Sequence, residues 1–160
     1  MRFEIEADPI AYILNGYSLH LGLTHGQWRH SIGTFAIDQP GFFLPNEAFD
    51  VFSRGVDLKT DYLFNKRKDG FFIGVQANYT WDRIEQGSSF SKATGGLNIG
   101  PRIGYRFFFN KKLEEAKGFY MAPWATYSYS TNTEVLNHEG EEYRPSSWFL
   151  FPTFHVGWRF

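Results

Sequence analysis

The residue pair best suited to nucleophilic catalysis is His30-Ser31, with Glu4 or Asp57 as a carboxylate that could orient the imidazole. A histidine activates a serine hydroxyl only when the two side chains lie within hydrogen-bonding distance. His30 and Ser31 fall in a segment with strand periodicity, and adjacent residues of a strand point to opposite faces. The sequence therefore argues against catalysis by this pair.

The other histidines indicate no metal or catalytic site. We expect His20 and His155 inside the protein as members of a polar network, while His25 falls in a turn and His138 in a long connection, without the spacing of zinc ligands. The chain has no cysteine, which excludes disulfides, thiolate chemistry and a cysteine-based zinc site. No cofactor is expected.

The composition limits the class of protein. A chain of 160 residues has the length of one domain, assigned here to residues 1–160. It is 20% aromatic, which is unusual for a water-soluble core, where Leu, Val and Ile dominate. A net charge of -1 gives no attraction toward nucleic acid. No apolar run reaches the roughly 18 residues of a membrane-spanning helix. The residues after Met1 lack the hydrophobic segment of a signal peptide, so we expect either an intracellular protein or the mature form of an exported one.

Alternation of apolar and polar residues with a period of two predicts an all-β protein of eight strands. Asn15-Gly16 predicts a two-residue hairpin between the first two strands. Short connections at 24–27, 65–70 and 110–118 alternate with long ones at 38–55, 84–94 and 130–146. This alternation is typical of an antiparallel up-and-down barrel with one short-turn rim. The predicted strands cover residues 2–14, 17–24, 28–37, 56–64, 71–83, 95–108, 119–130 and 148–160.

The two faces of these strands differ in charge. One face contains no Asp, Glu, Lys or Arg, which is what a lipid-facing surface requires, because a charge near mid-membrane costs about 2–4 kcal/mol. The other face carries balanced charges, as a narrow interior requires, because buried charges must be paired. We expect interior salt bridges rather than acid–base catalysis. The interior charges are Arg2, Arg29, Lys59, Arg102, Arg106 and Arg159 with Glu4, Glu6, Asp8, Asp57, Asp61 and Asp82.

Four prolines fall within the predicted strands: Pro9, Pro101, Pro123 and Pro152. Proline removes a hydrogen bond from the strand ladder. The barrel is therefore expected to contain bulges or local breaks at these positions.

The chain ends in FPTFHVGWRF, an amphipathic strand that stops on an aromatic residue. With the strand pattern, this resembles the small eight-stranded outer-membrane barrels of Gram-negative bacteria, the architecture of OmpX and of the OmpA barrel. The GYSLHLG strand is similar to uncharacterised Bacteroidota barrels. The resemblance implies an outer-membrane location, contact with its lipid and recognition of the last strand by the barrel-assembly machinery. The residues that would carry this assembly signal are Phe154, Val156, Trp158 and Phe160.

The first functional hypothesis is a non-enzymatic outer-membrane protein that acts through its loops or lipid face on a protein partner, in adhesion, envelope integrity or a larger complex. The alternatives are an enzyme that modifies lipopolysaccharide acyl chains and a soluble lipocalin-like carrier. Side chains fill an eight-stranded barrel, so an open pore is not expected. The loop at 41–55 is rich in apolar residues, which predicts packing on the rim, insertion into the lipid interface or a contact surface. Those residues are Phe42, Phe43, Leu44, Phe49, Val51 and Phe52.

Overall fold

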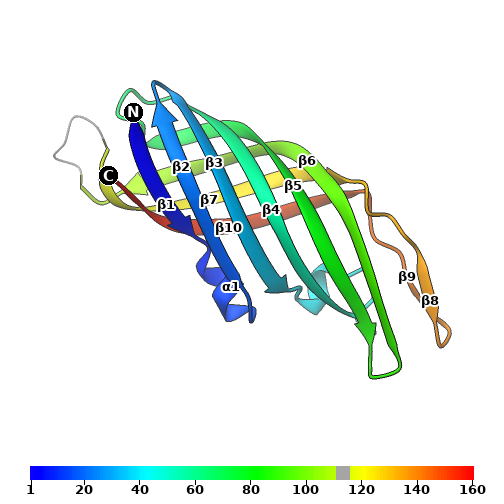
Figure 1. The fold of residues 1–160 in the computed structure, drawn as a ribbon. Coiled ribbons are helices and arrows are strands. Elements are labelled where there is room, and N and C mark those ends of the chain that lie inside the picture. The colour runs from blue at the N-terminus through cyan, green and yellow to red at the C-terminus, as the bar shows by residue number, and fades with distance from the viewer. Residues whose placement is uncertain (111–115) are drawn as a thin grey trace.

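The computed structural model describes residues 1–110 and 116–160 and confirms the closed antiparallel barrel. Within these residues, eight strands pair with their neighbours along the chain, and the last strand pairs with the first (Figure 1). The connection predicted at 110–118 lies mostly outside the described residues. The barrel strands are β1 (Arg2–Ala7), β2 (Tyr17–His25), β3 (Trp28–Asp38), β4 (Asp50–Leu63), β5 (Gly70–Gln86), β6 (Phe90–Phe108), β7 (Gly118–Ser130) and β10 (Trp148–Arg159).

The first strand is shorter than predicted, because residues 9–13 form the helix α1 (Pro9–Ile13). Asp8 caps this helix by accepting a hydrogen bond from the Ile10 amide at 2.8 Å. Pro9 occupies the first turn, where its missing N–H has no cost. The Gly16 amide donates to the Ala11 carbonyl at 2.8 Å, so Asn15-Gly16 ends a helix and does not form the predicted two-residue hairpin.

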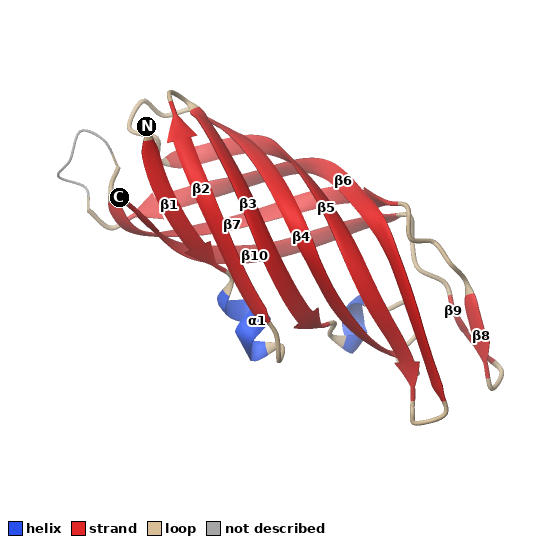
Figure 2. Cartoon of the chain, in the orientation of Figure 1, coloured by secondary structure: helices blue, strands red, loops and turns tan. Residues whose placement is uncertain are grey.

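The strands on the long-loop side extend further than predicted. β4 begins at Asp50, β5 continues to Gln86 and β6 begins at Phe90, so much of the predicted connections is strand. A short hairpin of β8 (Leu136–His138) and β9 (Glu141–Tyr143) occupies the connection before β10, and a 3-10 turn, η1 (Gly41–Phe43), precedes β4 (Figure 2). The alternation fails here because the buried face of these extensions includes the apolar residues Val51 and Ile84, while their outer face carries Arg54 and Arg83, the reverse of the pattern in the rest of the barrel.

Both chain termini lie at one rim, while α1 and the β8–β9 hairpin lie toward the other (Figure 1). We call the first rim the terminal rim and the second the loop rim. None of the described helices is long and apolar enough to cross a membrane.

Two of the prolines lie where strand pairing is interrupted, and no bulge is needed. The β6–β7 pairing omits Gly100-Pro101 and Tyr105-Arg106, while the register on either side of each gap stays the same. In that register Pro123 faces Tyr105, so both Pro101 and Pro123 lie in a gap. Thr126 Oγ1 donates to the Pro101 carbonyl at 2.9 Å and replaces part of the lost ladder. The predicted local breaks are confirmed at Pro101 and Pro123.

Pro152 lies on a free edge of β10. The pairing of β1 with β10 ends at Ala7 opposite Val156, so residues 148–155 have no β1 partner. The Phe160 amide donates to the Phe3 carbonyl at 3.0 Å, and alternate residues of a strand direct their backbone groups to the same neighbour. The nitrogen of Pro152 therefore faces the side without β1, where no ladder bond is lost.

Helix α1 covers this part of the barrel wall. Thr153 Oγ1 donates to the Asp8 carboxylate at 2.5 Å, and the Tyr12 hydroxyl donates to the Ser18 carbonyl at 2.9 Å. Ala11 is buried. One turn of helix thus connects β10 with β2 on the loop-rim side of the end of β1.

We predict that Asp8→Ala lowers the free energy of unfolding by about 1–3 kcal/mol, because it removes the helix cap and the Thr153 hydrogen bond. Asp8→Asn retains an oxygen that can accept from the Ile10 amide and should lose clearly less. Equilibrium denaturant unfolding measures both variants. Equal losses in the two would contradict the capping role.

Candidate functional site

The interior is organised around the carboxylate of Glu4. It accepts from Arg29 Nε at 2.7 Å, from Arg106 Nη2 at 2.7 Å and from Arg159 Nε at 2.6 Å. All four side chains are buried. Thr24 Oγ1 donates a further hydrogen bond at 2.7 Å. One carboxylate therefore connects three guanidinium groups on three different strands.

Glu6 forms a second centre beside the first. Its carboxylate lies 2.7 Å from Arg29 Nη2, and the Tyr120 hydroxyl donates to it at 2.6 Å. His155 Nδ1 lies 3.0 Å from the same carboxylate. Asp61, in turn, lies 3.0 Å from Arg29 Nη1, so Arg29 links β1 to β4 through the interior.

Lys59 and Arg102 occupy the interior further toward the loop rim. Lys59 Nζ donates to Asp57 at 2.9 Å. Arg102 lies 3.4 Å from Asp61, and its guanidinium is 4.4 Å from the centre of the Trp124 ring. These stacked and paired side chains fill the barrel.

Two of the predicted interior charges, Asp8 and Asp82, lie outside this network of pairs. Asp8 caps α1, and Asp82 accepts from Ser53 at 2.5 Å and from Asn132 at 2.9 Å. Arg2 is half-buried next to the terminal rim. Asp8 and Asp82 lie near the loop rim, where hydroxyl and amide groups from loops reach them, and this explains the difference from the expected pairing with cations.

A serine, a histidine and an aspartate do meet, but they are not the predicted set. Ser18 Oγ lies 3.2 Å from His20 Nδ1, and His20 Nε2 lies 2.7 Å from Asp57 Oδ2. Ser18 and His20 are two residues apart and share the inward face, a spacing that could have revealed the contact. A Cβ on Gly33 would overlap the His20 ring, so glycine is required at that position.

This arrangement is structural. Ser18 is only 1% exposed, and its oxygen accepts a hydrogen bond from the Asp8 amide at 3.1 Å. The Asp57 carboxylate is shared with Lys59. A substrate carbonyl therefore has no approach to the hydroxyl, as nucleophilic attack requires.

The predicted pair His30-Ser31 is divided between the two faces. His30 points outward, where its Nδ1 lies 3.1 Å from Thr60 Oγ1, and Ser31 is buried inside. Among the described residues, no three His, Cys, Asp or Glu side chains are placed so that they could hold a metal ion.

The outer surface of the barrel carries a broad apolar belt, on which His30 and Thr60 are polar. Outward-facing side chains from Phe71 to Trp81 on β5 are apolar or tyrosine, and Arg83 is the first charge toward the loop rim. On β4 the corresponding charge is Arg54, which pairs with Trp81 in register. These first outward-facing charges lie two residues apart in the register of the two strands, and they mark the edge of the belt.

The residues of the predicted assembly signal all lie on the outer face of β10. Trp158 and Phe160 are exposed, and Phe154 and Val156, which precede them along the chain, are partly exposed. The strand pairs with β7 along its whole length and with β1 at its end. Recognition of this strand by the assembly machinery stays a prediction.

Most of the predicted loop contact residues are packed. Phe49 and Val51 are buried with Ile84, Leu136 and Tyr143, and Leu44 lies against this cluster. Burial, with a smaller contribution from Asp82, raises the pKa of Tyr143 to about 12. The β8–β9 hairpin is therefore fixed to the extensions of β4 and β5. Phe52 faces outward on β4 under the guanidinium of Arg83.

Phe42 and Phe43 have different surroundings. Phe43 reaches across the loop rim to Phe151, with ring centres 6.4 Å apart, while Phe42 is 76% exposed. Only these two of the predicted contact residues are exposed at the surface of the loop rim.

The comparison with solved structures found the N-terminal β-barrel domain of Pseudomonas aeruginosa OprF, with a TM-score of 0.54 over 99% of this chain and 96% of that domain. The fold is that of an OprF-type barrel. At 13% identity the likeness shows the fold alone. No protein-family model and no curated protein matches the sequence.

We predict that Glu4→Gln lowers the free energy of unfolding of the barrel by about 3–5 kcal/mol, because three buried arginines lose their shared counter-charge. Glu85→Gln removes an exposed partner of Arg83 and should cost less than about 1 kcal/mol. Reversible denaturant unfolding compares the two. A similar small loss in both variants would contradict the role assigned to Glu4.

Proposed function

We propose that this OprF-type barrel is inserted in a bacterial outer membrane and acts there as a non-enzymatic protein through its loop-rim surface. The apolar belt carries the first part of the proposal. Monomeric soluble proteins rarely expose contiguous apolar patches of more than a few hundred Å². Here the exposed apolar side chains surround the barrel on all eight strands, among them Leu21, Ile32, Leu58, Val75 and Ile103.

The two rims support one orientation in that membrane. Small outer-membrane barrels have short turns on the periplasmic side and longer loops outside. The terminal rim, with its turn at residues 26–27, would face the periplasm. The loop rim, with α1, η1 and the β8–β9 hairpin, would face the exterior (Figure 1).

The interior supports a role outside catalysis and conduction. The inward-facing carboxylates of Glu4, Glu6 and Asp57 are engaged by arginine, lysine, histidine or tyrosine side chains, and Arg102 and Trp124 stack across the interior. The Ser18 hydroxyl is covered by the Asp8 backbone. What this protein offers to other molecules is therefore its outer surface and its loops.

The loop rim has the properties of a pre-organised contact surface. Its hairpins are fixed by the buried cluster around Phe49, so little conformational entropy remains to be lost on binding. Exposed apolar side chains lie at this rim, with Phe42 at 76% and Ile13 at 78% exposure. A protein partner that buries these side chains would account for their exposure.

If the barrel is inserted in a membrane, the energetic cost of a charged side chain in the belt should depend on its depth in the bilayer. Leu58→Arg, within the belt on β4, should lower the free energy of unfolding in lipid vesicles by about 2–4 kcal/mol. Phe52→Arg, beyond Arg54 on the same face of the same strand, should cost no more than about 1 kcal/mol. A wild-type protein that stays monodisperse without detergent, or equal losses in the two variants, would contradict insertion.

If the protein acts through its loop rim, binding of a partner should depend on Phe42. Cross-linking in whole cells, followed by purification of the tagged barrel, should yield one adduct that Phe42→Ser abolishes. Glu47→Ser, a polar change in the same loop, should retain it. An adduct that survives Phe42→Ser would contradict the assignment of this surface.

A further inference from the structure

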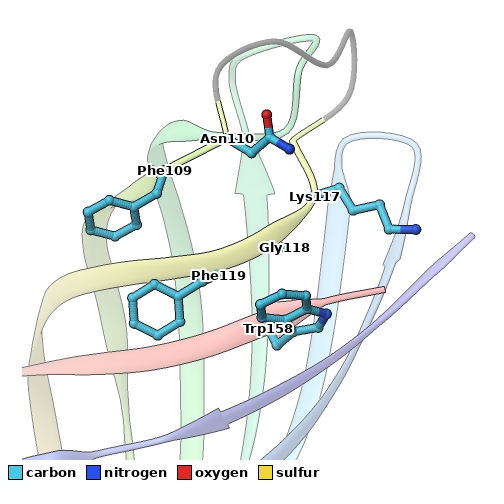
Figure 3. A pocket seen from close by; sticks show the side chains of 6 residues that line it. All are labelled: Phe109, Asn110, Lys117, Gly118, Phe119 and Trp158. Carbon is cyan, nitrogen blue, oxygen red and sulfur yellow. The ribbon is translucent and has the colours of Figure 1, made fainter.

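A hollow lies on the outer face of the barrel next to the terminal rim. Its volume is about 740 Å³, and Figure 3 shows the six residues that line it: Phe109, Asn110, Lys117, Gly118, Phe119 and Trp158. A second hollow, of about 460 Å³, adjoins it toward the middle of the barrel. Phe107, Phe109, Met121, Pro123 and Phe154 line that one, so Phe109 is common to both. We call the two together the β7 groove.

Two of the β7 residues that line the groove, Gly118 and Pro123, lack a large side chain. Gly118 has none, and a Cβ there would be no closer than 4.0 Å to Trp158. Pro123 faces Phe154 in register and lies beside a gap in the β6–β7 pairing. Phe107 on β6 lines the groove on one side of β7, and Phe154 and Trp158 on β10 line it on the other. Phe119 and Met121 of β7 itself line it between these two strands.

The chemistry of the groove changes along its length. The part between Phe107 and Phe154 is formed by apolar residues alone. At the terminal rim the lining adds the Asn110 amide and the Lys117 ammonium. In Figure 3 the ammonium of Lys117 and the indole nitrogen of Trp158 turn to the same side of the hollow. The apolar part of the β7 groove thus ends at the cation of Lys117 and at two neutral polar groups, the Asn110 amide and the Trp158 indole N–H.

We propose that the β7 groove binds one anionic glycerophospholipid, with an acyl chain along Met121 and Phe154 and its phosphate at Lys117. The inference rests on the proposed membrane location. Lysine attracts anionic headgroups at a membrane surface, and an indole N–H donates to phosphate oxygens at the same depth. The β7 groove carries a cation only at the end that lies at the level of the headgroups. A lipid is likewise charged at one end only, so it fits the groove better than a protein surface would.

The test uses the full chain reconstituted in dioleoyl-phosphatidylcholine vesicles that contain a minor share of dioleoyl-phosphatidylglycerol. Native mass spectrometry after transfer to mild detergent then counts the lipids that remain bound. We expect one phosphatidylglycerol to remain. Lys117→Gln should reduce its retention about fivefold, the factor expected for one lysine near an anionic surface. Lys92→Gln, at the loop rim, should have no effect.

A second variant tests the acyl part of the groove. Met121→Trp fills the apolar hollow and should abolish retention of the lipid, while Leu21→Trp, on the outer face of β2, should leave it unchanged. Retention that is equal in Met121→Trp and the wild type would overturn the proposal, and so would a dimer that Met121→Trp dissociates. A chain that does not enter vesicles at all would contradict the proposed membrane location, which is a separate outcome.

Discussion

The structure depends on the pairing of Glu4 with three buried arginines. The barrel closes where the two ends of the chain meet, and that seam has only a short ladder, from Glu4 opposite Arg159 to Ala7 opposite Val156. Glu4 adds ion pairs across the interior to Arg29 and Arg106 and, at the seam, to Arg159. A buried carboxylate cannot be left without them, because an unpaired buried charge costs several kcal/mol. The interior ion pairs thus stabilise the closure of the barrel between β1 and β10, where the backbone ladder is short.

The sequence predicts the faces of the strands well and the ends of the elements less well. From Tyr17 onward the alternation places side chains inside or outside correctly, because in these strands one face meets charge and the other does not. It fails at residues 9–13, where the Asp8-Pro9 helix start was available as a signal but the residues also alternate. It fails again beyond Arg54 and Arg83, where apolar Val51 and Ile84 are buried under the β8–β9 hairpin and the outer face is polar.

The candidate site could be predicted as a set of residues but not as a set of contacts. The inward-facing charges follow from the alternation, whereas their partners lie far apart along the chain, as for Glu4 and Arg159. Tyr120 and the Ser18–His20 contact carry no charge pattern and were missed. Because the interior is closed on itself, we propose that function lies on the outside, with the loop rim for a protein partner and the β7 groove for a lipid.

The most direct test of the central claim, a charged interior enclosed by a lipid-facing wall, is cysteine labelling along β5, because the chain has no cysteine of its own. Single variants Ile73→Cys, Val75→Cys, Ala77→Cys and Arg83→Cys would be reconstituted in vesicles and treated with a water-soluble maleimide. The account predicts that the first three are protected until the membrane is dissolved, while Arg83→Cys reacts at once. Equal and rapid labelling of all four positions in intact vesicles would contradict it.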